Sequence, residues 1–226
     1  MTAKVIEALE SIKSLDMFED LALYFIGGTA LSYYLDHRIS EDIDIISTEP
    51  LDYKNIISII SSIGGEKLRD ENAAALRMAG LVPDEYMLKF NLDGVKLEFF
   101  RASTPLQVNI ITDAKASKYL ESSLRILDVQ SIAKLKLIAL LSRNKSRDLF
   151  DFKVILEKNV LSIEEILDIA SQTKYKITTL ESLYTYIEKV EEPKDDEVVY
   201  LDEEKPINLD FDNIKAETLN AIRNIS

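Results

Sequence analysis

Apolar residues in the first half of the chain alternate between short strand-like runs and the three-and-four spacing of amphipathic helices. Val5, Leu9, Ile12 and Leu15 have the helical spacing. Asp93-Gly94, between two runs of alternating apolar residues, is a strong hairpin signal. We expect strands at Leu23–Ile26, Ile43–Ile46 and Leu106–Ile111, helices at Thr29–Leu35 and Tyr53–Ile63, and a hairpin of Met87–Leu92 with Val95–Phe100.

From Lys115 onward the pattern is almost entirely helical, and strand signals nearly vanish. Helices are expected at Val129–Leu141, Arg147–Glu157, Ile163–Ala170, Leu180–Val190 and Asn213–Ile225. The acidic stretch Glu191–Glu204 is expected to be exposed. The pattern therefore predicts an α/β domain over residues 1–114 and a helical domain over residues 115–226.

Composition narrows the possible chemistry. The 226 residues include no Cys, which excludes disulfides, a cysteine nucleophile and Cys-ligated metal sites. His37 is the only His, so a His-rich zinc site is excluded as well. The N-terminal segment lacks the apolar core of a signal peptide, and no apolar run approaches the roughly 18 residues of a membrane span. We therefore expect a cytoplasmic protein with no membrane partner.

The net charge of -13 argues against a general nucleic-acid coat protein, because bulk attraction to phosphate would have the wrong sign. The charge is unevenly distributed. Residues 115–158, the basic belt, carry 10 basic and 5 acidic side chains, giving +5, whereas residues 1–114 and 159–226 each carry -9. The belt is either a solvated helical surface or a local surface for RNA.

Candidate chemistry is concentrated in residues 25–46, where a strand is followed by Gly27-Gly28-Thr29 and then by a helix. Glycines let a phosphate approach the backbone, and a helix start offers unpaired N–H groups. Asp42 and Asp44 follow in a strand, where residues two apart share a face, and two such carboxylates suit Mg²⁺ or Mn²⁺. Taken singly, the glycines indicate only a tight turn and the aspartates only a solvent-facing strand. Together they predict a nucleotide site beside a cation site.

These residues resemble a known signature. Gly27-Gly28-Thr29 followed by Asp42-x-Asp44 looks like the motif of nucleotidyltransferases with a DNA polymerase β-like core, and the longer string with Arg38 and Ser40 resembles the AbiEii/MenT group of type IV toxin–antitoxin and phage-defence toxins. The resemblance implies an α+β fold, in which a polymerase β-like core of mixed sheet and flanking helices precedes an α-helical C-terminal domain. It also implies an NTP substrate, a tRNA or other RNA acceptor, and a separately encoded antitoxin.

A second block, Lys136, Ala139-Leu140, Arg143 and Arg147-Asp148-x-x-Asp151, resembles the group's helical motif. On a helix, Lys136, Ala139, Leu140 and Arg143 fall on one stripe, which could also be a plain solvent face. The resemblance implies the following roles: catalysis by Asp42, Asp44, Lys136 and Asp148; nucleotide binding by Gly27, Gly28, Thr29, Arg38, Ser40, Arg143 and Arg147; and metal binding by Asp42, Asp44 and Glu98.

Glu98 alternates with apolar residues in the second hairpin strand, which makes it the candidate third carboxylate, although a surface pair with a Lys explains it equally well. We interpret His37 as a surface or substrate-rim residue. The resulting hypothesis is a Mg²⁺-dependent nucleotidyltransferase that moves NMP from an NTP to an RNA end. The alternatives are a related transferase acting on a small molecule or a protein hydroxyl, which the acidic charge favours, and a catalytically silent binding module.

Overall fold

The computed structural model describes residues 1–71, 73–194, 199, 201 and 210–225, so most of the acidic stretch 191–204 lies outside the described residues. The chain forms two compact units. The first contains Met1–Tyr34 and Ser40–Asp128, and the second contains Leu35–Ile39 and Val129–Ser226. The division therefore falls after Asp128 rather than at the predicted residue 114, and the short segment Leu35–Ile39, ahead of the Asp42-x-Asp44 motif, belongs to the second unit.

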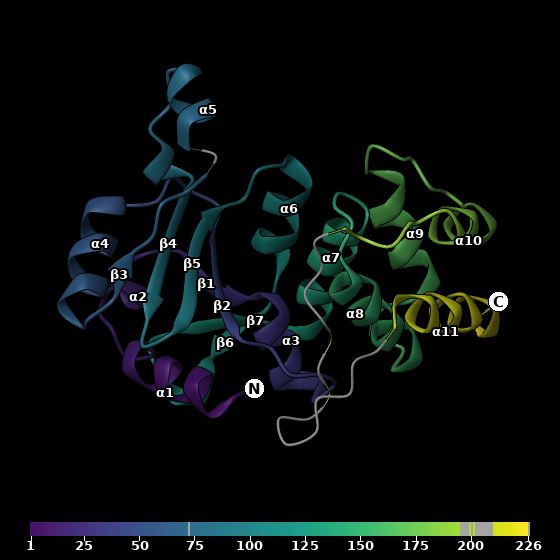
Figure 1. Ribbon diagram of the computed structural model, residues 1–226, viewed down its shortest axis with the longest axis horizontal. Coiled ribbons are helices and arrows are strands. Elements are labelled where there is room, and N and C mark those ends of the chain that lie inside the picture. The colour runs from purple at the N-terminus through teal and green to yellow at the C-terminus, as the bar shows by residue number, and fades with distance from the viewer. Residues whose placement is uncertain (72, 195–198, 200, 202–209, 226) are drawn as a thin grey trace. The chain divides into compact units, whose positions relative to one another are not determined.

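The first unit is built on a seven-stranded mixed sheet with the strand order β3-β4-β5-β2-β1-β7-β6 (Figure 1). Its central strand β2 pairs antiparallel with β1 and parallel with β5. The strands are β1 (Leu23–Ile26), β2 (Asp42–Ser47), β3 (Glu66–Lys67), β4 (Met87–Leu92), β5 (Val95–Arg101), β6 (Ala116–Lys118) and β7 (Arg125–Leu127). Sheet and helices together confirm the predicted α+β class.

The predicted hairpin is confirmed. Strands β4 and β5 pair antiparallel, and the turn at Asp93 and Gly94 has positive φ at both positions, as a tight hairpin turn requires. Alternate residues of both strands are buried, among them Phe90, Leu97 and Phe99. One face of this part of the sheet therefore forms the core of the first unit, and the other face carries the polar residues of the site.

The remaining elements of the first unit are helical. They are α1 (Ala3–Ile12), α2 (Met17–Asp20), α3 (Gly27–Leu35), α4 (Tyr53–Ser62), α5 (Ala73–Met78), α6 (Pro105–Asp113) and two short 3₁₀ turns, η1 (Pro83–Glu85) and η2 (Tyr119–Glu121). Helix α1 buries Val5, Leu9 and Ile12, which confirms the predicted amphipathic helix at the N-terminus.

The strand predicted at Leu106–Ile111 is wrong, because this segment is helix α6. A capping box starts the helix: the Thr104 hydroxyl accepts from the Gln107 backbone N–H, and the Gln107 side chain accepts from the Thr104 backbone N–H. Pro105 at the first helical position presets a helical φ. The start signals outweigh the β-branched residues that follow. Conversely, the three-residue strands β6 and β7 lie beyond residue 114, within the stretch predicted as a helical domain.

The second unit is helical, as the pattern predicts. Its helices are α7 (Val129–Leu140), α8 (Ser146–Glu157), α9 (Ile163–Ser171), α10 (Leu180–Glu188) and α11 (Phe211–Asn224). Helix α8 packs against both α7 and α11 (Figure 1). Six apolar residues along α8 are buried. Among the residues that the structure describes, no helix is long and apolar enough to cross a membrane.

The capping box predicts a measurable effect on the stability of the first unit. Replacing Thr104 by Ala removes one cap acceptor and should lower the free energy of unfolding by about 1 kcal/mol. Thr112→Ala, at an exposed position in the last turn of the same helix, should be neutral or slightly stabilising. Chemical denaturation followed by circular dichroism checks both; equal stabilities for the two variants would contradict the cap.

Candidate active site

Two carboxylates project from the same face of strand β2. Asp42 and Asp44 are half-buried, and the alternating Ile43 and Ile45 are fully buried on the opposite face. In the parallel register with β5, Asp44 lies opposite Glu98 and Asp42 lies opposite Lys96. Paired residues of neighbouring strands point to the same side of a sheet. The structure therefore brings three acidic residues and one lysine onto a single face.

Gly27, the first residue of α3, lies directly against Asp44. A Cβ atom added at Gly27 would overlap the carboxylate oxygen Oδ2 of Asp44 and lie 2.7 Å from its Cγ. Gly27 also has φ +83°, which L side chains rarely adopt. Only glycine therefore lets the start of a helix, with its unpaired N–H groups, approach this carboxylate so closely.

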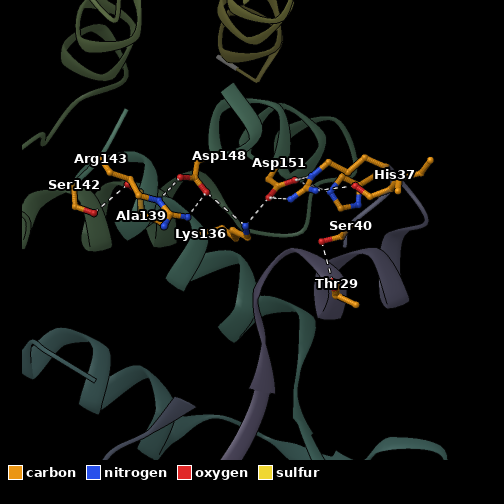
Figure 2. Close-up of polar contacts among 11 residues, drawn as sticks. Thr29, His37, Ser40, Lys136, Ala139, Ser142, Arg143, Asp148 and Asp151 are labelled. Atoms are coloured by element: carbon orange, nitrogen blue, oxygen red, sulfur yellow. Dashed lines mark hydrogen bonds and ion pairs between the residues drawn. The ribbon is translucent and has the colours of Figure 1, made fainter. Parts of the chain in front are cut away.

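A buried pair of hydroxyls fixes the same corner. The hydroxyls of Thr29 and Ser40 are hydrogen bonded to each other at 2.9 Å (Figure 2). The Thr29 hydroxyl also donates to the backbone carbonyl of Asp42. Both side chains are buried. Thr29 and Ser40, which we predicted to bind nucleotide, thus tie the first turn of α3 to the start of β2.

Lysines neutralise part of the acidic face. Lys96 Nζ lies 3.0 Å from Glu98 Oε2, and Lys89 Nζ lies 3.8 Å from Glu98 Oε1. Burial lowers the pKa of Lys96, but its hydrogen bond to Glu98 and the charges of Glu98, Asp42 and Asp44 outweigh burial and raise it. Lys96 is therefore a firmly protonated counter-ion of the three carboxylates.

The donor set on this face fits a divalent cation. Asp42 and Asp44 offer oxygen ligands from neighbouring positions of one strand, and the net surplus of carboxylates attracts a cation. Among the described residues, however, no group of three Asp, Glu, His or Cys side chains is arranged to hold a metal ion. Asp42 and Asp44 are thus the main candidate ligands. Glu98 is a weaker candidate, because its carboxylate is paired with Lys89 and Lys96.

The second block forms an ionic network within the second unit (Figure 2). Lys136 Nζ, on α7, lies 2.8 Å from Asp151 Oδ2 and 3.5 Å from Asp148 Oδ1, both on α8. Arg143 closes the network with a two-point contact to Asp148, Nε to Oδ2 at 2.7 Å and Nη2 to Oδ1 at 3.1 Å. Arg147 lies half-buried in the first turn of α8. The stripe on α7 is therefore not a plain solvent face.

Asp151 is the centre of this network, a position that the sequence did not reveal. Its fully buried carboxylate accepts from Arg38 Nε at 2.6 Å and Nη2 at 3.1 Å, and from His37 Nε2 at 2.8 Å. Burial raises the pKa of Asp151, but the charges of Arg38 and Lys136 and the hydrogen bonds from His37 and Arg38 hold it well below its ordinary value. Arg38, predicted to bind nucleotide, is thereby committed to a carboxylate.

The prediction that His37 lies on the surface is wrong, because its side chain is only 2% exposed. The ring is parallel to Phe150, with centroids 6.1 Å apart, and buried Nδ1 has no hydrogen-bond partner among the described residues. Burial lowers the pKa of His37, and the charges of Arg38 and Lys136 act in the same direction, against the contact with Asp151. The lowered pKa favours the neutral ring at neutral pH, and the contact with the Asp151 carboxylate favours the tautomer with its proton on Nε2.

The match to a known family settles what kind of protein this is. A family model described as the nucleotidyl transferase AbiEii toxin of type IV toxin–antitoxin systems matches residues 13–223. The chain belongs to this family. It is accordingly a nucleotidyltransferase, and the predicted resemblance is confirmed.

One curated protein resembles this AbiEii-family chain in sequence, and two solved structures share its fold. An uncharacterised protein of Aquifex aeolicus is 28% identical over 162 residues, covering 71% of this chain and 69% of the relative. The crystal structure of JHP933 from Helicobacter pylori has a TM-score of 0.52 at 16% identity, covering 100% of this chain and 93% of that one. A candidate nucleotidyltransferase from H. pylori gives 0.51 at 17%, covering 100% and 96%.

The contact between Gly27 and Asp44 predicts a position-specific effect. Gly27→Ala combines backbone strain with overlap against Asp44, so it should displace the carboxylate and abolish most nucleotidyl transfer. Gly64→Ala is the matched control, because Gly64 has φ +92° but nothing within 4 Å of the added Cβ. Activity assays and thermal unfolding of both variants separate the overlap from the strain. Equal losses of activity would contradict the role of Gly27 beside Asp44.

The buried His37 predicts a pH dependence of stability. Because the folded-state pKa lies below the unfolded value of about 6.5, only the unfolded chain takes up this proton as the pH falls below about 6.5. The free energy of unfolding should therefore fall by up to about 1.4 kcal/mol per pH unit until the lowered pKa is reached.

The matched variant is His37→Gln, which keeps an N–H donor for Asp151 and cannot titrate. Because His37 is the only His, this variant should flatten the stability profile between about pH 7 and pH 5. Denaturant unfolding of both proteins across this range is the measurement. Parallel profiles for wild type and variant would show that another group causes the dependence.

Proposed function

We propose that this AbiEii-family enzyme transfers NMP from an NTP to the end of an RNA, such as a tRNA, in a Mg²⁺- or Mn²⁺-dependent reaction. The observation that carries the proposal is the contact of Asp44 with Gly27, which joins a carboxylate suited to a cation to a helix start suited to a phosphate. Nucleotidyl transfer needs both next to each other.

In the proposed reaction, the acceptor hydroxyl loses its proton to a base or to solvent, and its oxygen forms a bond to the α-phosphorus. The bond from that phosphorus to the oxygen that bridges to the β-phosphate breaks. Pyrophosphate leaves. The N–H groups at the start of α3 would hold phosphate oxygens, and Gly27 and Gly28 would let them approach. Asp42 and Asp44, with Glu98 as the proposed third ligand, would hold the cation, which when bound stabilises the charge on the attacking and leaving oxygens.

For the second unit we propose that Lys136 supplies positive charge to a phosphate group, aided by Arg143 and Arg147. Lys136 is 10% exposed and held between Asp148 and Asp151, so its position is fixed before any substrate binds. A preorganised cation stabilises developing charge better than a mobile one. Asp148, which contacts both Lys136 and Arg143, would orient these groups, and a role in deprotonating the acceptor is the other function we propose for it.

The RNA acceptor is proposed from the toxin family and from the basic belt, and the same family suggests a separately encoded antitoxin as partner. The net charge of -13 favours the second candidate, a small-molecule or protein hydroxyl as acceptor. The two candidates differ in which fraction of a cell extract receives the labelled nucleotide.

The proposal predicts the effect of neutralising either aspartate. Asp42→Asn and Asp44→Asn should each lower transfer from an α-labelled NTP to total RNA by at least about 10³-fold, since each removes a charge that holds the cation. The fold should persist, because one of two repelling charges is removed. Glu41→Gln, at the exposed neighbouring position, is the matched control and should retain activity.

The assay uses each of the four NTPs in turn, with Mg²⁺, with Mn²⁺ and with EDTA, and separates RNA from protein and small molecules. Wild-type activity in both aspartate variants would overturn the mechanism. Label in protein or in small molecules, but not in RNA, would replace the RNA acceptor by the second candidate.

A further inference from the structure

A cavity of about 500 Å³ opens in the second unit beside the ionic network. Three cations, Arg143, Lys145 and Lys189, and two aromatic rings, Tyr175 and Tyr186, line it. The volume falls within the range of about 300–1,000 Å³ typical of small-ligand sites. The cavity therefore has room for one nucleotide.

The charge of the cavity opposes that of the protein. The chain carries 40 acidic and 27 basic residues, yet no acidic residue is among those described that line the cavity. Arg143 is held at its position by Asp148 while its side chain remains 60% exposed. A concave surface lined by cations attracts a single anionic group. The acidic remainder of the protein repels an extended polyanion.

The aromatic pair gives the cavity an apolar wall. The rings of Tyr175 and Tyr186 lie 4.7 Å apart at 54°, and the Tyr186 hydroxyl donates to the Leu140 carbonyl at 3.3 Å, which fixes that ring. Tyr175 is 47% exposed, and Lys174 Nζ lies 4.8 Å from its ring centroid. An exposed aromatic ring next to a second, anchored ring offers a surface on which a base can stack.

We propose that this cavity binds one nucleotide of single-stranded RNA, with its base against Tyr175 and its phosphate between Arg143, Lys145 and Lys189. The inference rests on the proposed RNA acceptor, for which it names a binding site. Stacking and charge together favour RNA over a free phosphate, which would use the cations alone, and over an apolar ligand, which would use only the rings.

The test measures the binding of a short fluorescein-labelled oligoadenylate by anisotropy, in EDTA and without NTP, so that binding is independent of transfer. Tyr175→Ala should weaken binding by about tenfold, as expected for one lost stacking contact, and Tyr175→Phe should keep the wild-type affinity. Lys189→Gln should weaken binding and flatten the salt dependence of log K by about 0.7, the contribution of one phosphate contact on a single strand.

Lys158→Gln is the charge control, because Lys158 is an exposed lysine directly after α8 that does not line the cavity. It should leave affinity and salt dependence unchanged. Inorganic phosphate at equal concentration should compete poorly with the oligonucleotide.

Wild-type affinity in Tyr175→Ala, equal effects of Lys189→Gln and Lys158→Gln, or no binding by the wild type would each overturn the site. Competition by phosphate as strong as by unlabelled oligonucleotide would show a phosphate site instead. Failure of the proposed function is distinguishable, because Asp44→Asn should bind the oligonucleotide like wild type while losing transfer.

Discussion

The second unit depends on one buried charge, the carboxylate of Asp151. An ionised carboxylate with no exposed surface is strongly disfavoured unless several donors surround it. Arg38, His37 and Lys136 supply those donors, and the resulting stabilisation is enough to keep its pKa well below the ordinary value. Because His37 and Arg38 belong to the Leu35–Ile39 segment and Lys136 belongs to α7, the carboxylate fixes this segment, α7 and α8 together in one unit.

Arg38 links the buried carboxylate of Asp151 to the segment of chain that leads to the aspartates of β2. It lies four residues before Asp42 in the chain, yet its guanidinium is committed to Asp151 within the second unit. The motif that resembles a nucleotidyltransferase signature thus contains two kinds of residue: the aspartates of β2, which face the acidic surface, and Arg38, which anchors the chain elsewhere. Thr29 and Ser40 are likewise structural in their contacts, since their hydroxyls bind one another and the backbone of Asp42.

The hydrophobic pattern predicts the elements that bury one face and leave the other face polar. Strands β4 and β5 alternate buried and polar residues, and Asp93-Gly94 lies between them. Their antiparallel pairing could therefore be predicted from the sequence. The same alternation placed Asp42 and Asp44 on one face. The pattern predicts a strand in place of helix α6 because the apolar, β-branched residues of this segment suit a strand. The signal that decides for a helix is the capping box of Thr104 and Gln107, together with Pro105 at the first helical position. Strands β6 and β7 are too short for any period to show.

The network around Asp151 could not be predicted in this way, because the pairings of His37 and Arg38 with Asp151 join residues more than a hundred positions apart in the chain. A spacing of three between Asp148 and Asp151 showed that both share a face of α8, but not that the face is buried. For His37 the sequence offered only an Arg neighbour and a helix end, which suit a surface residue. A polar residue can be buried when it has hydrogen-bonding or charged partners, and the tertiary fold determines which partners it meets.

The distribution of charge connects these findings to acceptor choice. Much of the basic belt is neutralised locally: Lys134 pairs with Glu165 at 2.9 Å, Lys153 with Glu217 at 2.5 Å, and Lys136 with two aspartates. The belt is also divided between the two units, with residues 115–128 in the first and 129–158 in the second. A continuous phosphate-tracking surface is therefore a poorer model for RNA recognition than a few fixed cations in a shaped cavity. On a protein with a charge of -13, the general electrostatic interaction with a polyanion is repulsive. Binding and selectivity therefore depend on such local contacts, and a polyanion that lacks the complementary shape is repelled by the rest of the surface.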